Sequence, residues 1–77
     1  MVEAFVLIQT EQGKMAQVAE KVQEIEGVDD GDIVAGPYVV IAHLSAEEID
    51  AIGKLIVSEV QTVPGVIRTL TCPVVRL

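Results

Sequence analysis

The side chains of this chain that could do chemistry are few and stand apart from one another. His43 lies late in an apolar stretch, Tyr38 is the only tyrosine and Cys72 is the only cysteine among 77 residues. Histidine and tyrosine can transfer protons, and a thiolate can attack an electrophile. A histidine in an apolar strand is more often a hydrogen-bonded core or interface residue, and no basic group stands near Cys72 to activate it. We therefore predict no catalytic residue.

The acidic stretch Asp29-Asp30-Gly31-Asp32 suggests a cation site, but its pattern does not fit one. A hand-type calcium loop needs twelve residues that end in a ligating Glu, and this stretch lacks them. A structural zinc site needs about four ligands, and only His43 and Cys72 are soft candidates. We expect the acidic stretch to be a solvated turn or bulge, and we predict no metal and no cofactor.

Charge and hydropathy exclude two classes of partner. Five Lys and Arg stand against twelve Asp and Glu, a formal charge of -7, which repels phosphate backbones and anionic membranes. We therefore expect no direct nucleic-acid binding. No apolar run approaches the roughly 20 residues of a spanning helix, and the start of the chain lacks the pattern of a signal peptide. We expect a cytoplasmic protein.

The elements that would position these residues form an internal repeat. We expect strand, helix and strand in each half of the chain, because the second half repeats the apolar and glycine positions of the first at a constant offset. The matching positions are Val18 and Ile56, Val22 and Val60, Ile25 and Val63, and Gly27-Val28 and Gly65-Val66.

Hydrophobic periodicity predicts the elements of both halves. The first half should contain a strand at residues 2–9, a helix capped by Thr10 and ending near Glu24, and a strand at 33–35 after a left-handed Gly27. The second half should contain a strand at 38–44, a helix that begins at a capping box formed by Ser45 and Glu48, and a strand at 66–75.

Two such units in one sheet predict a ferredoxin-like α+β fold (βαββαβ), with four antiparallel strands and both helices on one face. The strands at 2–9 and 38–44 are apolar on both sides, so the helix-free face would expose a large apolar patch. A domain of this size also has a small core. We therefore predict that two copies pair sheet to sheet.

Several segments together resemble the Lrp/AsnC (feast/famine) family of transcriptional regulators. They are Ala4-Phe5-Val6-Leu7-Ile8, Ile25-Glu26-Gly27-Val28, Gly36-Pro37-Tyr38, and Val63-Pro64-Gly65-Val66 followed by Ile67-Arg68-Thr69-Leu70-Thr71. The resemblance is to the effector-binding and oligomerisation (RAM) domain and spans nearly the whole chain. Full-length members carry an additional helix-turn-helix domain, for which residues 1–77 leave no room, so we expect a single stand-alone effector domain.

The resemblance implies a homo-oligomer of dimers, commonly a ring of eight, that holds an amino acid or related metabolite between dimers. The chain would then modulate full-length regulators of the family by joining them in mixed rings. Gly36, Pro37 and Tyr38 match the turn at the family's effector site, and Thr69 and Thr71 match polar positions of its last strand. Val39 stands where the family usually has Asp, so the family's usual effector specificity is not expected here.

A small dimeric ferredoxin-like enzyme is the alternative interpretation. A cofactor-free monooxygenase or isomerase of this fold would use His43 or Tyr38 as its acid-base group. Such a cleft usually contains more aromatic and polar residues than the single Phe and single Tyr here provide. We therefore predict a binding and assembly module that is not an enzyme.

Overall fold

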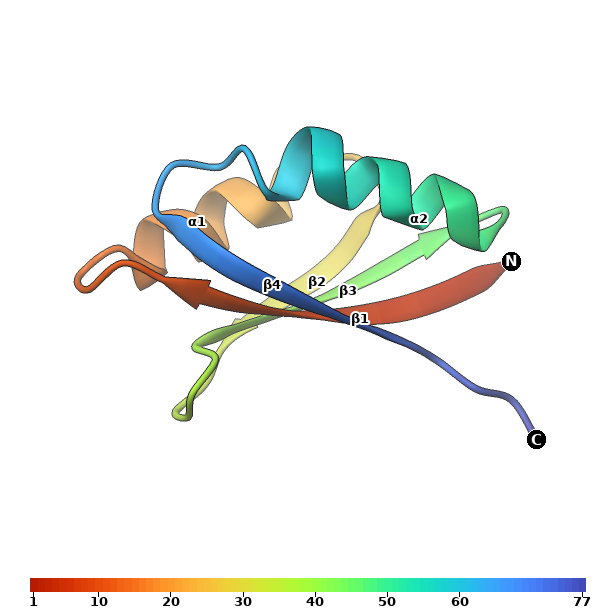
Figure 1. The fold of residues 1–77 in the computed structure, drawn as a ribbon, viewed down its shortest axis with the longest axis horizontal. Helices are drawn as coiled ribbons and strands as arrows, with labels where there is room; N and C mark the ends of the chain where they lie inside the picture. Colours follow the sequence, from red (N-terminus) through yellow and green to blue (C-terminus); the bar gives the residue numbers. More distant parts are fainter.

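The computed structural model describes residues 1–77 and contains one four-stranded antiparallel sheet, with both helical segments on the same side (Figure 1). The strand order is β2-β3-β1-β4, which makes β3 and β1 the central strands. This is the ferredoxin-like arrangement that the sequence predicts. The elements are β1 (Val2–Thr10), α1 (Met15–Gln23), β2 (Val28–Ile33), β3 (Val40–Ala46), α2 (Ile49–Leu55), the π-helical segment η1 (Ile56–Val60) and β4 (Val66–Pro73).

The core lies between the sheet and the helices and is entirely aliphatic. Side chains alternate along a strand, so every second residue of the two central strands faces the helices. Each helical segment contributes residues spaced three and four apart, which lie on one face of a helix. The buried residues are Ala4, Val6, Ile8, Val18, Ala19, Val22, Val40, Ala42, Leu44, Ile52, Ile56 and Val60.

The internal repeat is confirmed in three dimensions. Gly27 and Gly65 both adopt a φ of 100°, which a side chain would strain. Gly27 follows α1 and lies against α2, where an added Cβ would come within 3.1 Å of Leu55. Gly65 follows η1 and lies against α1, where an added Cβ would come within 3.1 Å of Val18. The two halves therefore hold each other at equivalent points.

The helices begin later than the capping residues suggest. Thr10 pairs with Val66 as the last residue of β1, and α1 begins only after Lys14, so the predicted Thr10 cap is wrong. The predicted capping box is also wrong. Ser45 belongs to β3, where its hydroxyl donates to Asp29 Oδ2 at 2.7 Å, and Glu48 caps α2 without a side-chain hydrogen bond. In both cases strand pairing extends the strand past the local capping signal.

The second strand lies earlier in the chain than predicted. β2 occupies Val28–Ile33 and includes the acidic stretch, so the prediction of a strand at 33–35 is wrong. The pairing of β2 with β3 shifts register between Val28 and Asp30, which confirms the bulge interpretation of this stretch. Aspartates are tolerated because β2 is an edge strand whose side chains reach water. Gly31 faces inward, where the Gln23 Nε2 donates to its carbonyl oxygen at 2.6 Å.

Two further boundaries differ from the sequence prediction. Residues 35–38 bend between β2 and β3, and β3 runs from Val40 to Ala46. The β4 strand ends at Pro73, whose nitrogen cannot donate to a neighbouring strand. Beyond it the chain projects past the sheet on the side away from the helices (Figure 1).

We predict opposite effects of alanine at two glycines. Gly27→Ala should lower the free energy of unfolding by about 1–3 kcal/mol, because the residue would be held at a strained φ. Gly53→Ala should raise it by about 0.5–1 kcal/mol, because a helix interior favours alanine, and a Cβ at Gly53 meets nothing within 4 Å. Urea unfolding of both variants measures the difference. Equal destabilisation by both would contradict the packing described above.

Candidate functional site

Thr69 and Thr71 lie on the edge strand β4, next to η1. They pair with Ile8 and Val6, two core residues, so both threonines project toward the helices. Thr71 lines a cleft of about 330 Å³ between α2, η1 and β4, which we call the α2–β4 cleft. Its lining is aliphatic with two polar groups, and consists of Ile49, Ile52, Gly53, Ile56, Val57, Gln61, Thr71 and Pro73.

Gly36, Pro37 and Tyr38 lie in the bend between β2 and β3. Pro37 and the neighbouring Val39 line a second cleft of about 250 Å³, which we call the turn cleft. Gly36 and Pro37 are exposed, and Tyr38 is half-buried and lines neither cleft. The other lining residues of the turn cleft are Gln9, Thr10, Glu11, Gln12, Gly13 and Met15.

Within one chain, the two groups of predicted site residues are separated by β1. Val39 donates its backbone N–H to the Ile8 carbonyl on the β3 side of that strand, at 3.0 Å, whereas Thr69 pairs with Ile8 on the β4 side. No cleft contains residues from both groups. Each cleft offers only part of the polar and apolar contacts that a small-molecule site usually provides.

The structure adds Gln61 and Gly53 to the candidate residues, and the sequence analysis named neither. The Gln61 N–H donates to the Ile56 carbonyl at 2.8 Å, five residues back, which is the π-helical bond of η1. Its side-chain amide donates to Thr69 Oγ1 at 3.0 Å. Such π-helical turns occur often at functional sites, but no residue pattern in the sequence indicates one.

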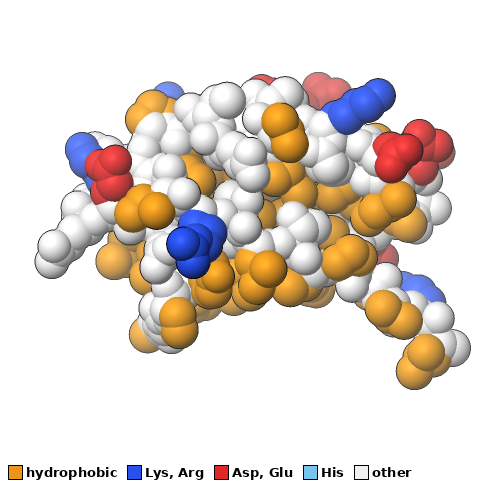
Figure 2. Space-filling view, in the orientation of Figure 1, with side chains coloured by type: hydrophobic (Ala, Val, Ile, Leu, Met, Phe, Trp, Pro, Cys, Tyr) orange, Lys and Arg blue, Asp and Glu red, His pale blue; other side chains and the backbone are white.

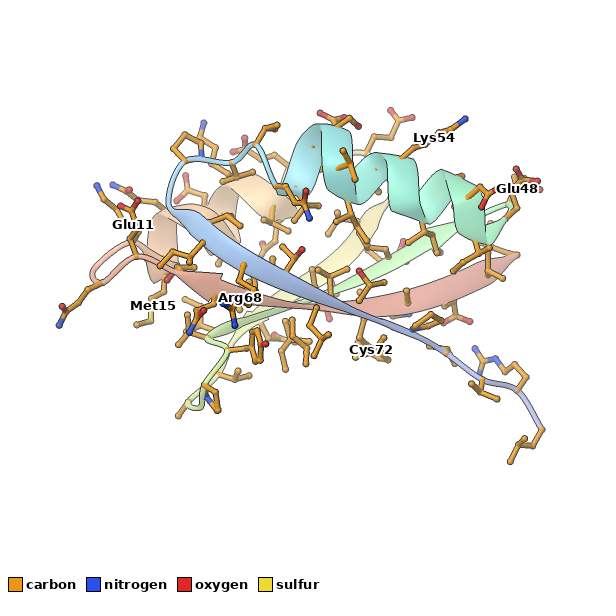
Figure 3. All side chains as sticks on the ribbon, viewed as in Figure 1. Glu11, Met15, Glu48, Lys54, Arg68 and Cys72 are labelled. Atoms are coloured by element: carbon orange, nitrogen blue, oxygen red, sulfur yellow. The ribbon has the colours of Figure 1, made fainter.

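The side of the sheet away from the helices is open and largely apolar. We call it the open sheet face, and Figure 2 shows hydrophobic side chains gathered along it. Phe5 and Leu70 are 43% and 46% exposed, and Figure 3 shows Cys72 on this side. By register, the apolar part of the face consists of Phe5, Leu7, Ile41, Leu70 and Cys72.

A polar cluster lies at the end of the open sheet face where β1 begins. His43 Nε2 is 2.9 Å from Glu3 Oε1, and His43 Nδ1 is 3.1 Å from Asp29 Oδ2. Asp29 also accepts the Ser45 hydroxyl, and Arg76 forms an ion pair with Glu3. We call these five residues the histidine cluster. The hydrogen bond from His43, followed by that from Arg76, lowers the pKa of the Glu3 carboxyl from its usual 4.5.

Two observations concern metal binding and acid-base catalysis. No group of His, Cys, Asp and Glu side chains is arranged to hold a metal ion. His43 and Tyr38, the acid-base residues of the alternative enzyme, line none of the clefts.

None of the helices has the length and apolar character that crossing a membrane requires.

Comparison with known proteins identifies the family. The model of the Lrp/AsnC ligand binding domain matches residues 3–77. The chain belongs to this family. An uncharacterized HTH-type transcriptional regulator of Pyrococcus furiosus is 31% identical over 71 residues, which are 88% of this chain and 47% of that regulator. The chain therefore spans about half the length of the curated relative that it matches.

Solved structures of other proteins superpose closely on this chain. TTHA0845 from Thermus thermophilus is 26% identical and superposes with a TM-score of 0.93, over 100% of this chain and 96% of that one. AsnC of E. coli superposes with a TM-score of 0.90 over 99% of this chain and 52% of its own, and its 19% identity shows the fold alone. Membership makes the chain a regulatory, effector-binding domain of a family of transcriptional regulators.

The lowered pKa of Glu3 predicts an acid-dependent contribution to stability. A carboxyl whose pKa is depressed by folding stabilises the protein above its unfolded pKa, and this stabilisation disappears as the pH falls through the folded value. Glu3→Gln should therefore be less stable than the natural chain at pH 7, and the difference should shrink as the pH falls below about 4.5. Urea unfolding across this range measures it, with Glu20→Gln on the exposed side of α1 as the control. A stability difference between Glu3→Gln and the natural chain that stays constant with pH would rule out the hydrogen bonds of the Glu3 carboxylate with His43 and Arg76 as its cause.

Proposed function

We propose that this domain senses an amino acid or a related small metabolite at sites shared between neighbouring copies, and that it has no enzymatic activity. The observation that carries the proposal is the match to the Lrp/AsnC ligand-binding domain over residues 3–77. The position of His43 and Tyr38 outside every cleft supports binding rather than proton-transfer catalysis.

The effector site is proposed to form when two partial clefts from different copies meet. The turn cleft supplies Pro37, with Gly36 and Tyr38 beside it in the same bend. The α2–β4 cleft supplies Thr71, and Thr69 lies two residues before it on β4. Because β1 separates these groups within one chain, assembly is the way to bring them around one ligand. The aliphatic lining of the α2–β4 cleft suits a hydrocarbon side chain, while threonine hydroxyls and backbone groups of the turn can orient polar groups.

Effector binding is coupled to assembly in this proposal. A ligand held between copies binds only the assembled state, so it shifts the equilibrium toward that state. The assembly unit would be a dimer joined through the open sheet faces, and dimers would associate further into a ring of about eight chains, as the resemblance to the family implies. Mixed rings with full-length regulators would carry the signal to DNA, because the acidic chain itself does not attract DNA.

Removal of one hydroxyl from the proposed effector site should weaken binding. Thr71→Val should lower the affinity for the effector about ten-fold through the loss of one hydrogen bond, with little change in stability, since Thr71 is exposed. Calorimetry over the common amino acids would identify the effector and give both affinities, and sedimentation with and without it would report assembly. The matched control is Thr62→Val, which lies outside both clefts. Absence of binding to every amino acid, with no change in assembly, would contradict the amino-acid proposal.

A charge on the open sheet face should prevent dimerisation. Leu70→Glu should give a folded monomer at micromolar concentration, because pairing of the sheets would bury two unpaired carboxylates. Ser58→Glu adds the same charge on the helical side, where Ser58 is exposed, and should leave the dimer intact. Sedimentation equilibrium distinguishes these outcomes, and a dimer of Leu70→Glu as tight as that of the natural chain would place the interface elsewhere.

A further inference from the structure

The histidine cluster contains one imidazole between two carboxylates. Glu3 on β1 faces Nε2 at 2.9 Å, and Asp29 on β2 faces Nδ1 at 3.1 Å. Both distances are hydrogen-bonding distances. His43 itself is on β3, so the cluster links three adjacent strands across the open sheet face.

The number of N–H donors on the His43 ring shows in which protonation state the ring can make both hydrogen bonds. An ionised carboxylate only accepts hydrogen bonds, and a neutral imidazole carries a single N–H. Both contacts of His43 are therefore made only when both ring nitrogens are protonated. In the neutral form, the lone pair of one nitrogen faces a carboxylate oxygen, and that carboxylate loses its charged partner.

The protonation of His43 decides how many cations face the carboxylates of the cluster. Glu3 approaches from β1, and Asp29 and the register neighbour Asp30 approach from β2. The Phe5 ring lies 5.1 Å away, and Arg76 of the C-terminal segment contacts Glu3. Three carboxylates therefore face two cations when His43 is protonated and one when it is neutral. The only side chain that faces the cluster from β4 is Cys72, opposite Phe5.

We propose that protonation of His43 controls the pairing of this chain with a second copy through the open sheet face. This inference rests on the proposed sheet-to-sheet dimer. The cluster is continuous with the apolar part of that face, because His43 pairs with Phe5 and Phe5 pairs with Cys72. A second copy that covers the apolar residues therefore also takes water away from the cluster.

Covering the cluster has different costs in its two protonation states. With a protonated imidazole, Glu3 and Asp29 both keep a cationic partner when water leaves. Asp30 has no cationic partner in either state and accepts the Gly31 N–H. With a neutral imidazole, one carboxylate per chain loses its cation and must be desolvated unpaired, which is unfavourable. A two-fold dimer contains two such clusters, so the dimer should weaken as the pH rises through the range in which histidine titrates.

Sedimentation equilibrium between about pH 5.5 and about pH 7.5 tests the inference, because this range stays below the ordinary pKa of a thiol. A reducing buffer prevents a disulfide between copies through the exposed Cys72. Histidine is the side chain whose charge ordinarily changes in this range, and His43 is the only histidine in the chain. The dimer dissociation constant should rise about ten-fold or more from the lower to the higher pH, as loss of a charge-assisted hydrogen bond predicts.

Two variants separate this effect from a general pH dependence. His43→Gln cannot titrate, and the double variant Glu3→Gln with Asp29→Asn removes the carboxylates that a neutral imidazole would leave unpaired. His43→Gln should dimerise with a dissociation constant that changes less than about three-fold over the same range. In the double variant the dependence should vanish or reverse, because a protonated imidazole without its carboxylates is itself costly to cover. Circular dichroism checks that each variant is folded.

The outcomes distinguish the inference from the proposed function. A dimer of the natural chain with the same affinity at every pH would overturn the inference and leave the sheet-to-sheet dimer standing. The same pH dependence in either variant would also overturn it. A monomer at every pH would overturn both the proposed dimer and the inference.

Discussion

The constraint on which this structure depends is that two short helices cover only one side of a sheet whose central strands are apolar on both sides. The covered side forms an aliphatic core with no buried polar side chain. The other side carries exposed Phe5 and Leu70 together with a charged cluster at one end. In a chain this small, the second side contains too much apolar surface to leave in water. The proposed assembly, the proposed effector site between copies and the proposed pH response all follow from that imbalance.

The internal repeat holds the covered side together. Gly27 and Gly65 allow each half to end its helical segment in a conformation that other residues avoid, and each lies against the helix of the other half. Neither half can bury its helix alone, so the halves fold as one unit. The pairing of β1 with β3 and with β4 in turn keeps the two partial clefts on opposite sides of β1. A site that needs both clefts therefore requires more than one copy.

Sequence patterns predicted the fold well but placed the ends of its helices and strands less accurately. The spacing of Val18, Val22, Ile52 and Ile56 identified the buried faces, because burial in a helix has a fixed period. The predicted caps at Thr10 and Ser45 were wrong, since strand pairing with distant residues outweighed local hydrogen bonding. The location of β2 was missed because three aspartates disfavour a strand, and only its place at the sheet edge makes them acceptable. The family resemblance supplied the candidate turn and threonines, whereas nothing in the sequence indicated Gln61.

The sequence by itself determined the layer architecture, the repeat and the acidic character of the chain, because these depend on periodicity and composition. It also singled out His43 as a hydrogen-bonded residue of a strand. Only the tertiary structure placed Glu3 and Asp29 on either side of that ring, since the three residues are distant in the chain and meet through strand register. The same is true of the separation between the turn and the threonines. Local patterns set the elements, and long-range pairing set which polar groups meet.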